Sequence, residues 1–72
     1  MDIVLIAQII HQRRNILKVS QEQLSELSGV GIKTIYAIEQ GKANPSFKTL
    51  YKVLDTLGLE IKLQLKQINV NE

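Results

Sequence analysis

Apolar residues recur three or four positions apart in four segments of the chain, which is the spacing of one face of an α-helix. Three of these segments follow a residue suited to cap a helix, Asp2, Ser20 or Ser46, and Gly58 stands where the last segment would end. The two middle segments are too short to form stable helices alone, so we expect all four to pack into one all-α domain. The predicted helices span residues 3–17, 21–28, 32–40 and 47–57.

A tight turn separates the two middle helices. The hydroxyl of Ser20 can accept the amide hydrogen of Gln23, whose side chain can reach back to the Ser20 amide, as in a capping box. Gly29 can adopt the left-handed conformation that ends a helix, so the chain turns sharply there. Ile35 and Ile38 have the spacing of a core-facing stripe in the third helix. Its outward face then carries Ile32, Lys33, Tyr36, Ala37 and Gln40.

The same spacing predicts which side chains form the core. Leu24 and Leu27 share one face of the second helix. The first helix has a core stripe of Ile6, Ile10 and Leu17, and the last helix has a core face of Phe47, Leu50, Val53, Leu54 and Leu57. A domain this small cannot easily cover a second apolar stripe on the first helix, so we assign that stripe to a subunit contact. The second stripe contains Leu5, Ile9 and Ile16.

After Gly58 the apolar period changes from 3.6 to 2, which predicts a β-strand over residues 59–66. A lone strand leaves its backbone donors and acceptors unpaired, and no second strand is predicted elsewhere in the chain. We therefore expect the strand to pair antiparallel with its copy in a homodimer. A register centred on Leu63 pairs Glu60 with Lys66 and avoids opposing lysines. The predicted dimer interface contains Leu59, Ile61, Leu63 and Leu65.

Length and charge refine the domain organisation. A chain of 72 residues allows one domain that buries only about 60% of its unfolded surface, which favours association. We divide it into a helical domain at 1–58, a dimerising tail at 59–67 and a flexible C-terminus at 68–72. The net charge is only +2, but residues 31–52 hold four lysines against the single acid Glu39. Positive charge therefore gathers around the third helix, as in a nucleic-acid-binding surface.

Several other classes of function find no support in the sequence. There is no cysteine, so no disulfide framework or thiolate metal site is expected, and His11 has no companion at metal-ligand spacing. The carboxylates form no acid/base pair, and no nucleophile has a histidine partner, so we expect no enzyme and no cofactor. The longest apolar run is too short to span a bilayer and no signal sequence is evident. We expect a cytoplasmic protein.

A joint pattern along residues 10 to 58 resembles the helix-turn-helix of the Xre/Cro family of phage-repressor-like DNA-binding domains. The matching residues are Gln21, Gly29, Ile35 and Ile38, and Ser25 matches in being small. Residues 38–42, 44–46 and 49–50 also match the family's usual run. Three positions depart from the family pattern: Gly31 replaces a capping Ser or Thr, Ser25 replaces Ala, and Lys18 replaces Gly. The resemblance implies a bacterial protein associated with the nucleoid through a double-stranded DNA partner, with the third helix in the major groove of an inverted-repeat operator.

The resemblance also implies roles for individual residues. The base-reading positions are Ile32, Lys33 and Ala37, flanked by Thr34 and Tyr36; Tyr36 alternatively packs on the second helix. The phosphate-binding positions are Gln21, Gln40, Lys42, Asn44, Ser46 and Lys48. Arg14 and Glu39 occupy positions that in family members often form a buried ion pair, and the alternative is a pair of surface charges worth under about 1 kcal/mol.

The predicted tail narrows the resemblance to the HipB-like antitoxins, which repress their own operons and bind a kinase-like toxin. A transcriptional repressor acting as the antitoxin of a HipBA-like operon is accordingly the first interpretation. The alternatives are a phage-type repressor, a restriction-modification controller protein, and a module that chiefly binds and neutralises a protein partner, with DNA binding secondary.

Overall fold

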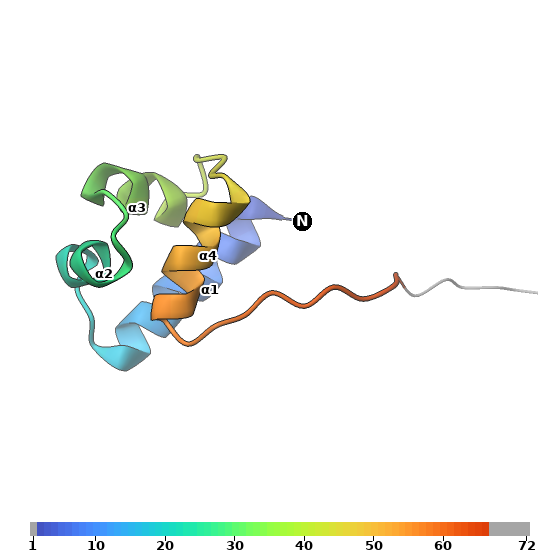
Figure 1. Ribbon diagram of the computed structural model, residues 1–72, viewed down its shortest axis with the longest axis horizontal. Coiled ribbons are helices and arrows are strands. Elements are labelled where there is room, and N and C mark those ends of the chain that lie inside the picture. The colour runs from blue at the N-terminus through green and yellow to red at the C-terminus, as the bar shows by residue number, and fades with distance from the viewer. Residues whose placement is uncertain (1, 67–72) are drawn as a thin grey trace, which may run out of the picture.

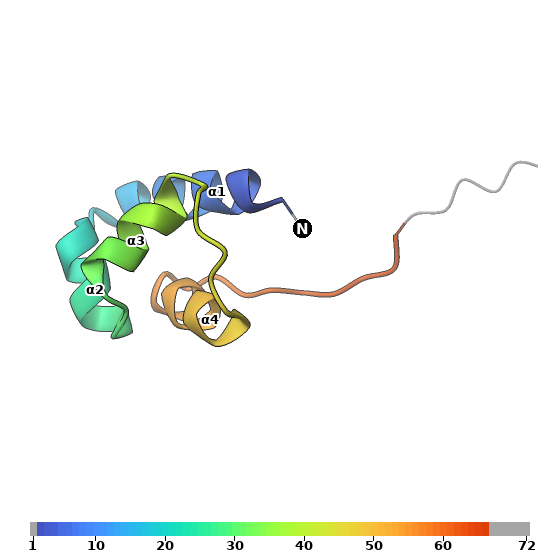
Figure 2. The same ribbon diagram turned by 90° about the horizontal axis from the view of Figure 1, so that it is seen from above.

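The computed structural model describes residues 2–66 and contains four α-helices in that part of the chain. They are α1 (Ile3–Leu17), α2 (Gln21–Ser28), α3 (Ile32–Glu39) and α4 (Phe47–Thr56) (Figure 1). The prediction of an all-α, four-helix domain is confirmed, and α3 and α4 each end one residue earlier than predicted. Figures 1 and 2 show α2 and α3 together at one side of the bundle and an extended tail leaving it after α4.

Short polar side chains begin three of the helices, as the sequence predicts. The Asp2 carboxylate accepts the amide hydrogen of Val4 at 3.0 Å, and the Ser46 hydroxyl accepts that of Thr49 at 3.1 Å. At the start of α2 a complete capping box is present: the Gln23 amide donates to Ser20 Oγ at 3.0 Å, and the Ser20 amide donates to Gln23 Oε1 at 2.8 Å. These contacts satisfy amides that have no partner within the helix.

Two serines and a glycine hold the turn between α2 and α3. Gly29 has φ +75° and ends α2 in the left-handed conformation, with its amide donating to the Ser25 carbonyl. The Ser25 hydroxyl donates to the Val30 carbonyl at 2.6 Å, and the Val30 amide donates to Ser28 Oγ at 3.2 Å. The hydroxyl of Ser25, which the alanine usual at this position would lack, therefore fastens the turn that sets the direction of α3.

Lys18 occupies a position that a glycine would fill with less strain. It caps the C-terminus of α1 with φ 59° and ψ 39°, and within residues 2–66 it is the only non-glycine residue with positive φ. The left-handed conformation costs an L-residue about 1 kcal/mol. Two hydrogen bonds offset this cost, because in this conformation the Lys18 and Val19 amides donate to carbonyls of the last turn of α1.

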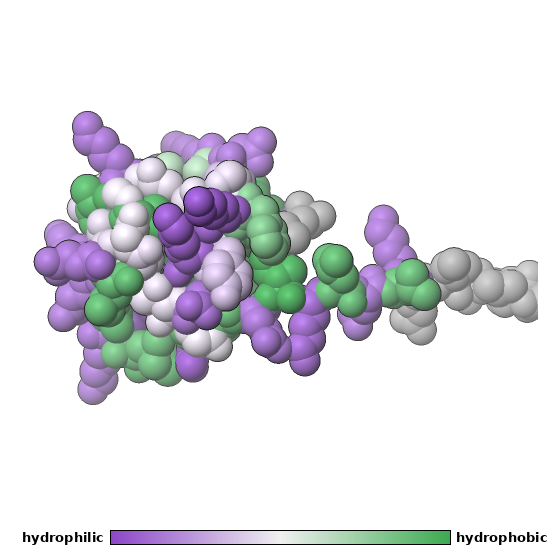
Figure 3. Space-filling view, viewed as in Figure 1, coloured by the Kyte–Doolittle hydropathy of each residue, from purple (hydrophilic) through white to green (hydrophobic). Residues whose placement is uncertain are grey.

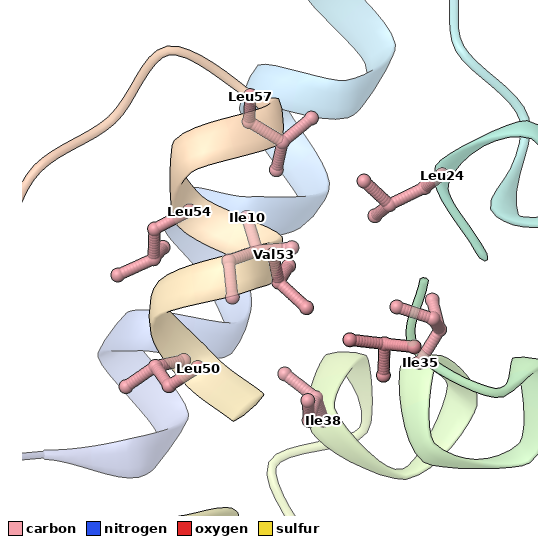
Figure 4. Packing of buried hydrophobic residues seen from close by; sticks show 9 residues of the cluster. Ile10, Leu24, Ile35, Ile38, Leu50, Val53, Leu54 and Leu57 are labelled. Atoms are coloured by element: carbon pink, nitrogen blue, oxygen red, sulfur yellow. The ribbon is translucent and has the colours of Figure 1, made fainter. Parts of the chain in front are cut away.

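Side chains from all four helices meet in one core (Figure 4). Each fully buried Leu, Ile or Val contributes roughly 1.5–3 kcal/mol of transfer free energy. Three predicted core residues are instead exposed: Phe47 and Leu27 each keep 68% of their surface accessible, and Leu17 keeps 41%. A helical repeat identifies an apolar stripe but not how far the neighbouring helices extend along it, which is why these three predictions were wrong. The fully buried side chains are Ile10, Leu24, Ile35, Ile38, Val53 and Leu57.

The tail after Gly58 forms no strand within the described residues, and its hydrophobic and hydrophilic side chains alternate (Figure 3). Leu59 and Ile61 are partly buried against their own core, and their contact with a second subunit stays a prediction. Leu63 and Leu65 are 92% and 96% exposed. Strand pairing between two copies stays a prediction. Residue 67 of the predicted tail and the predicted flexible C-terminus at 68–72 lie outside the described residues.

Candidate nucleic-acid interface

Helix α3 presents one face to solvent because its other face is fixed in the core. Ile35 and Ile38 are each 1% exposed, so α3 cannot rotate without uncovering them. Lys33, Thr34 and Tyr36 on α3 are exposed. Ile32 and Ala37, the other two predicted base-reading residues, are partly exposed. The five predicted base-reading positions thus lie at the surface of one short, rigidly held helix.

A cationic stretch runs from the end of α3 into α4. Gln40, Lys42, Asn44, Ser46 and Lys48 are all exposed, and residues 40–54 contain no acidic side chain. The Ser46 hydroxyl already donates to Thr49 Oγ1 at 3.0 Å, so its main contact is the cap of α4. The Gln21 side chain, the sixth predicted phosphate contact, is engaged with Glu39 instead, at 3.2 Å from Nε2 to Oε1.

Arg14 and Glu39 form a two-point ion pair that joins α1 to α3. Arg14 Nε lies 2.7 Å from Glu39 Oε2, and Nη2 lies 3.0 Å from Oε1. The side chains are 11% and 5% exposed, so this is not a solvated surface pair. Arg14 Nη1 also donates to the Val19 carbonyl at 3.0 Å, which ties the segment leading into α2 to the same pair. Such parallel bonds fix both position and orientation.

Two further side chains reach the same carboxylate, and the sequence analysis missed both contacts. His11 Nδ1 lies 3.1 Å from Glu39 Oε1, which also accepts from Gln21. Asn15 completes the cluster, with its amide nitrogen 3.1 Å from His11 Nε2. The sequence does contain a signal for this cluster. Arg14 and Asn15 follow His11 by three and four residues, so the three side chains share one face of α1. Three helices are therefore linked through one carboxylate.

These contacts shift the pKa of both ionised partners toward the charged form. Burial alone would raise the pKa of Glu39, but hydrogen bonds from Arg14, His11 and Gln21 and the charge of Arg14 outweigh it, so the pKa lies below its ordinary value. The hydrogen bond to Glu39 raises the pKa of Arg14 against the opposing effect of burial. Glu39 is thus a carboxylate at neutral pH.

Among residues 2–66, no three His, Asp or Glu side chains are grouped so that they could hold a metal ion. The helices there are also too short or too polar for any of them to cross a membrane.

Comparison with known proteins agrees with this architecture, in which a tight turn joins two short helices and the second is exposed. Residues 10–64 match a family model described as "Helix-turn-helix". The chain is 41% identical over 61 residues to an uncharacterised HTH-type transcriptional regulator of Haemophilus influenzae. It is 37% identical over 62 residues to a putative HTH-type transcriptional regulatory protein of Methanococcus maripaludis. A similar regulator of Methanocaldococcus jannaschii is 39% identical over 49 residues.

The chain therefore belongs to the helix-turn-helix family. The matches cover 85%, 86% and 68% of this chain and 61%, 18% and 74% of the Haemophilus, Methanococcus and Methanocaldococcus proteins, respectively. The chain thus spans less than two thirds of the length of the first two relatives. Because the relatives include a bacterium and archaea, they do not support the expected bacterial origin.

Proposed function

We propose that this protein is a DNA-binding transcriptional repressor that reads its operator with α3. The observation that carries the proposal is the outward face of α3, exposed at Lys33 and continuous in sequence with the acid-free stretch at residues 40–54. The relatives named as HTH-type transcriptional regulators support the same conclusion. A repressor acts by occupying its site, which requires a positioned helix and no catalytic group.

The chemistry of α3 suits the major groove. The Lys33 ammonium can donate to O6 and N7 of guanine, and Ile32 and Ala37 can contact thymine methyl groups. Around this face the exposed Gln40, Lys42, Asn44 and Lys48 are placed to contact phosphates and fix the register of the helix on the duplex. With only one cationic base reader on α3, sequence-dependent DNA shape is expected to supply part of the specificity.

Salt-sensitive binding to the duplex upstream of its own gene is the direct test of this proposal. Each phosphate neutralised by a cation releases counterions, so a dimer making six or more such contacts should lose roughly a thousandfold in affinity between about 50 and 200 mM salt. Fluorescence anisotropy with that duplex, and with a scrambled duplex of equal length, measures both affinity and specificity. Absence of salt-sensitive binding would contradict the proposal.

We further propose that two copies act together through the tail and the uncovered apolar stripe of α1. Leu5, Ile9 and Ile16 are 52%, 43% and 69% exposed, and Leu63 and Leu65 are almost fully exposed. Burial of these side chains against a second copy would remove a substantial apolar area from water. A two-fold dimer would set its two α3 helices about 34 Å apart, one turn of B-DNA, so the operator should be an inverted repeat.

Leu63→Asp is expected to yield monomers and to weaken operator binding. The side chain is 92% exposed in the single chain, so the substitution should cost the monomer little stability, but it would place a charge in the apolar contact between copies. A monomer cannot bind both half-sites of the operator at once, so the affinity for the operator should fall. Analytical ultracentrifugation measures the assembly. The control Leu27→Asp changes an exposed leucine on α2, outside the proposed contact, and should leave the dimer intact.

The finer role we propose is that of a HipB-like antitoxin, which would bind a kinase-like toxin protein as well as its own operator. The support is the tail, extended beyond the helices with Leu63 and Leu65 uncovered. A kinase-like gene next to this one, and co-purification of its product with this chain, would support that role. Neighbouring phage or restriction genes would instead favour a phage-type repressor or a controller protein.

A further inference from the structure

An open hollow of about 440 Å³ lies where α1, α2 and α3 meet beside the proposed DNA-binding face. Two of its lining residues, Gln21 and Gln40, are predicted phosphate contacts, and Tyr36 belongs to the predicted base-reading face. Glu39 forms part of the wall, and its charge is matched by Arg14 at 2.7 Å. The remaining lining residue is His11, which reaches the hollow from α1 with 55% of its side chain exposed.

Both ring nitrogens of His11 have polar neighbours. Nδ1 lies 3.1 Å from Glu39 Oε1 and 3.3 Å from Arg14 Nη2, and Nε2 lies 3.1 Å from the amide nitrogen of Asn15. With its single proton on Nδ1, the imidazole donates to Glu39, and Nε2 accepts from Asn15. A second proton on Nε2 would turn this acceptor into a donor. Asn15, which is exposed, would then rotate away or present its oxygen, and an Nε2–H donor would be available to an incoming acceptor.

Protonation would also change the net charge of the cluster. The groups that face His11 are Arg14 and Asn15 from α1, Gln21 from α2, and Tyr36 and Glu39 from α3. Arg14 and Glu39 carry opposite charges, which cancel each other. With neutral His11 the cluster therefore carries no net charge, and with protonated His11 it carries one positive charge beside two predicted phosphate contacts.

We propose that protonated His11 binds a DNA phosphate at this hollow, with Nε2–H as the donor, so that affinity for DNA increases as the pH falls. The inference rests on the proposed DNA-binding function and adds a residue of α1 to the interface. The contact is to the backbone of the duplex, so it strengthens binding to any sequence by the same factor.

The test is the affinity of the dimer for its upstream duplex and for a scrambled duplex at pH 6 and pH 8, at constant ionic strength. For the native chain we expect binding about threefold tighter or more at pH 6 on both duplexes, in line with one partly solvated charge contact per subunit. His11→Gln keeps a hydrogen-bonding side chain without a titrating charge and should remove this difference. His11→Lys, which is permanently charged, should bind tightly at both values.

A calorimetric titration gives an independent readout, because tighter binding at low pH requires proton uptake on binding. The heat measured in two buffers of different ionisation enthalpy should show uptake near pH 7 with the native chain and less with His11→Gln. If the native chain and His11→Gln show the same ratio of affinities at the two pH values, the role of His11 is overturned while DNA binding stands. If neither duplex is bound under any condition, both proposals fail.

Discussion

Lys33→Glu is expected to weaken binding to the upstream duplex by about a hundredfold or more. Lys33 is the one cation on the outward face of α3, and each good contact between a side chain and a base edge is worth roughly 1–3 kcal/mol. A dimer loses two such contacts at once. The new carboxylates also repel the phosphates, so binding to scrambled DNA should fall as well. Fluorescence anisotropy titrations of both duplexes measure the change.

Lys18→Glu provides the matched control, because it alters the net charge of the chain by the same amount. Lys18 is exposed at the C-terminus of α1, beside Leu17 and Gln23 rather than the outward face of α3. Its replacement should lower the affinity for DNA only through long-range electrostatic repulsion, which salt screens. Equal losses in the two variants would contradict placement of α3 in the groove.

If the chain also neutralises a protein partner through a separate surface, Lys33→Glu should leave that activity intact.

Glu39→Gln is expected to destabilise the fold by about 3 kcal/mol, the usual cost of breaking a buried ion pair. Both oxygens of Glu39 accept from donors: Oε2 from Arg14, and Oε1 from Arg14, His11 and Gln21. Whichever way an amide is oriented, its NH₂ group would face another donor, and the Arg14 charge would remain 11% exposed without a counterion. The melting temperature should fall by about 10 °C or more.

Glu26→Gln is the control for this prediction, because Glu26 is an exposed carboxylate on α2. Surface substitutions of this kind usually change stability by less than about 0.5 kcal/mol. Urea unfolding of both variants and the native chain gives the comparison. A melting temperature of Glu39→Gln close to that of the native chain would show that the ion pair contributes little to the fold.

The cost of Glu39→Gln should also depend on pH, with a sign set by the lowered pKa of Glu39. Because the pKa in the folded chain lies below that in the unfolded chain, the carboxylate contributes its full stability above the unfolded value of about 4.3. That contribution is lost as the pH falls through the lower, folded pKa. Urea unfolding between pH 7 and pH 2.5 should therefore show the native chain approaching Glu39→Gln in stability as the solution becomes acidic.

Much of the fold could be predicted from the sequence because it depends on contacts over three or four residues. The caps at Asp2, Ser20 and Ser46 and the left-handed Gly29 all act within one turn of chain, and the structure has each where the sequence indicates. The apolar spacing likewise identified Ile35 and Ile38 as buried. Once these two are fixed in the core, helical geometry places Lys33 on the surface.

The remaining features depend on how far one helix extends past another, which no local pattern records. Phe47 and Leu27 continue apolar stripes but project beyond the neighbours that would cover them. Leu59 and Ile61 alternate like strand residues, yet they pack on their own core because the chain turns back along it after Gly58. The alternation correctly separated apolar from polar positions in the tail but did not identify what the apolar ones contact.

The sequence by itself determined four helices, their caps, the turn at Gly29 and the outward position of Lys33, since these follow from local hydrogen bonds and helical periodicity. Only the tertiary structure decided that His11 and Gln21 join Arg14 on the Glu39 carboxylate. Those contacts span 28, 18 and 25 residues of chain, and they form because core packing brings α1, α2 and α3 to one point.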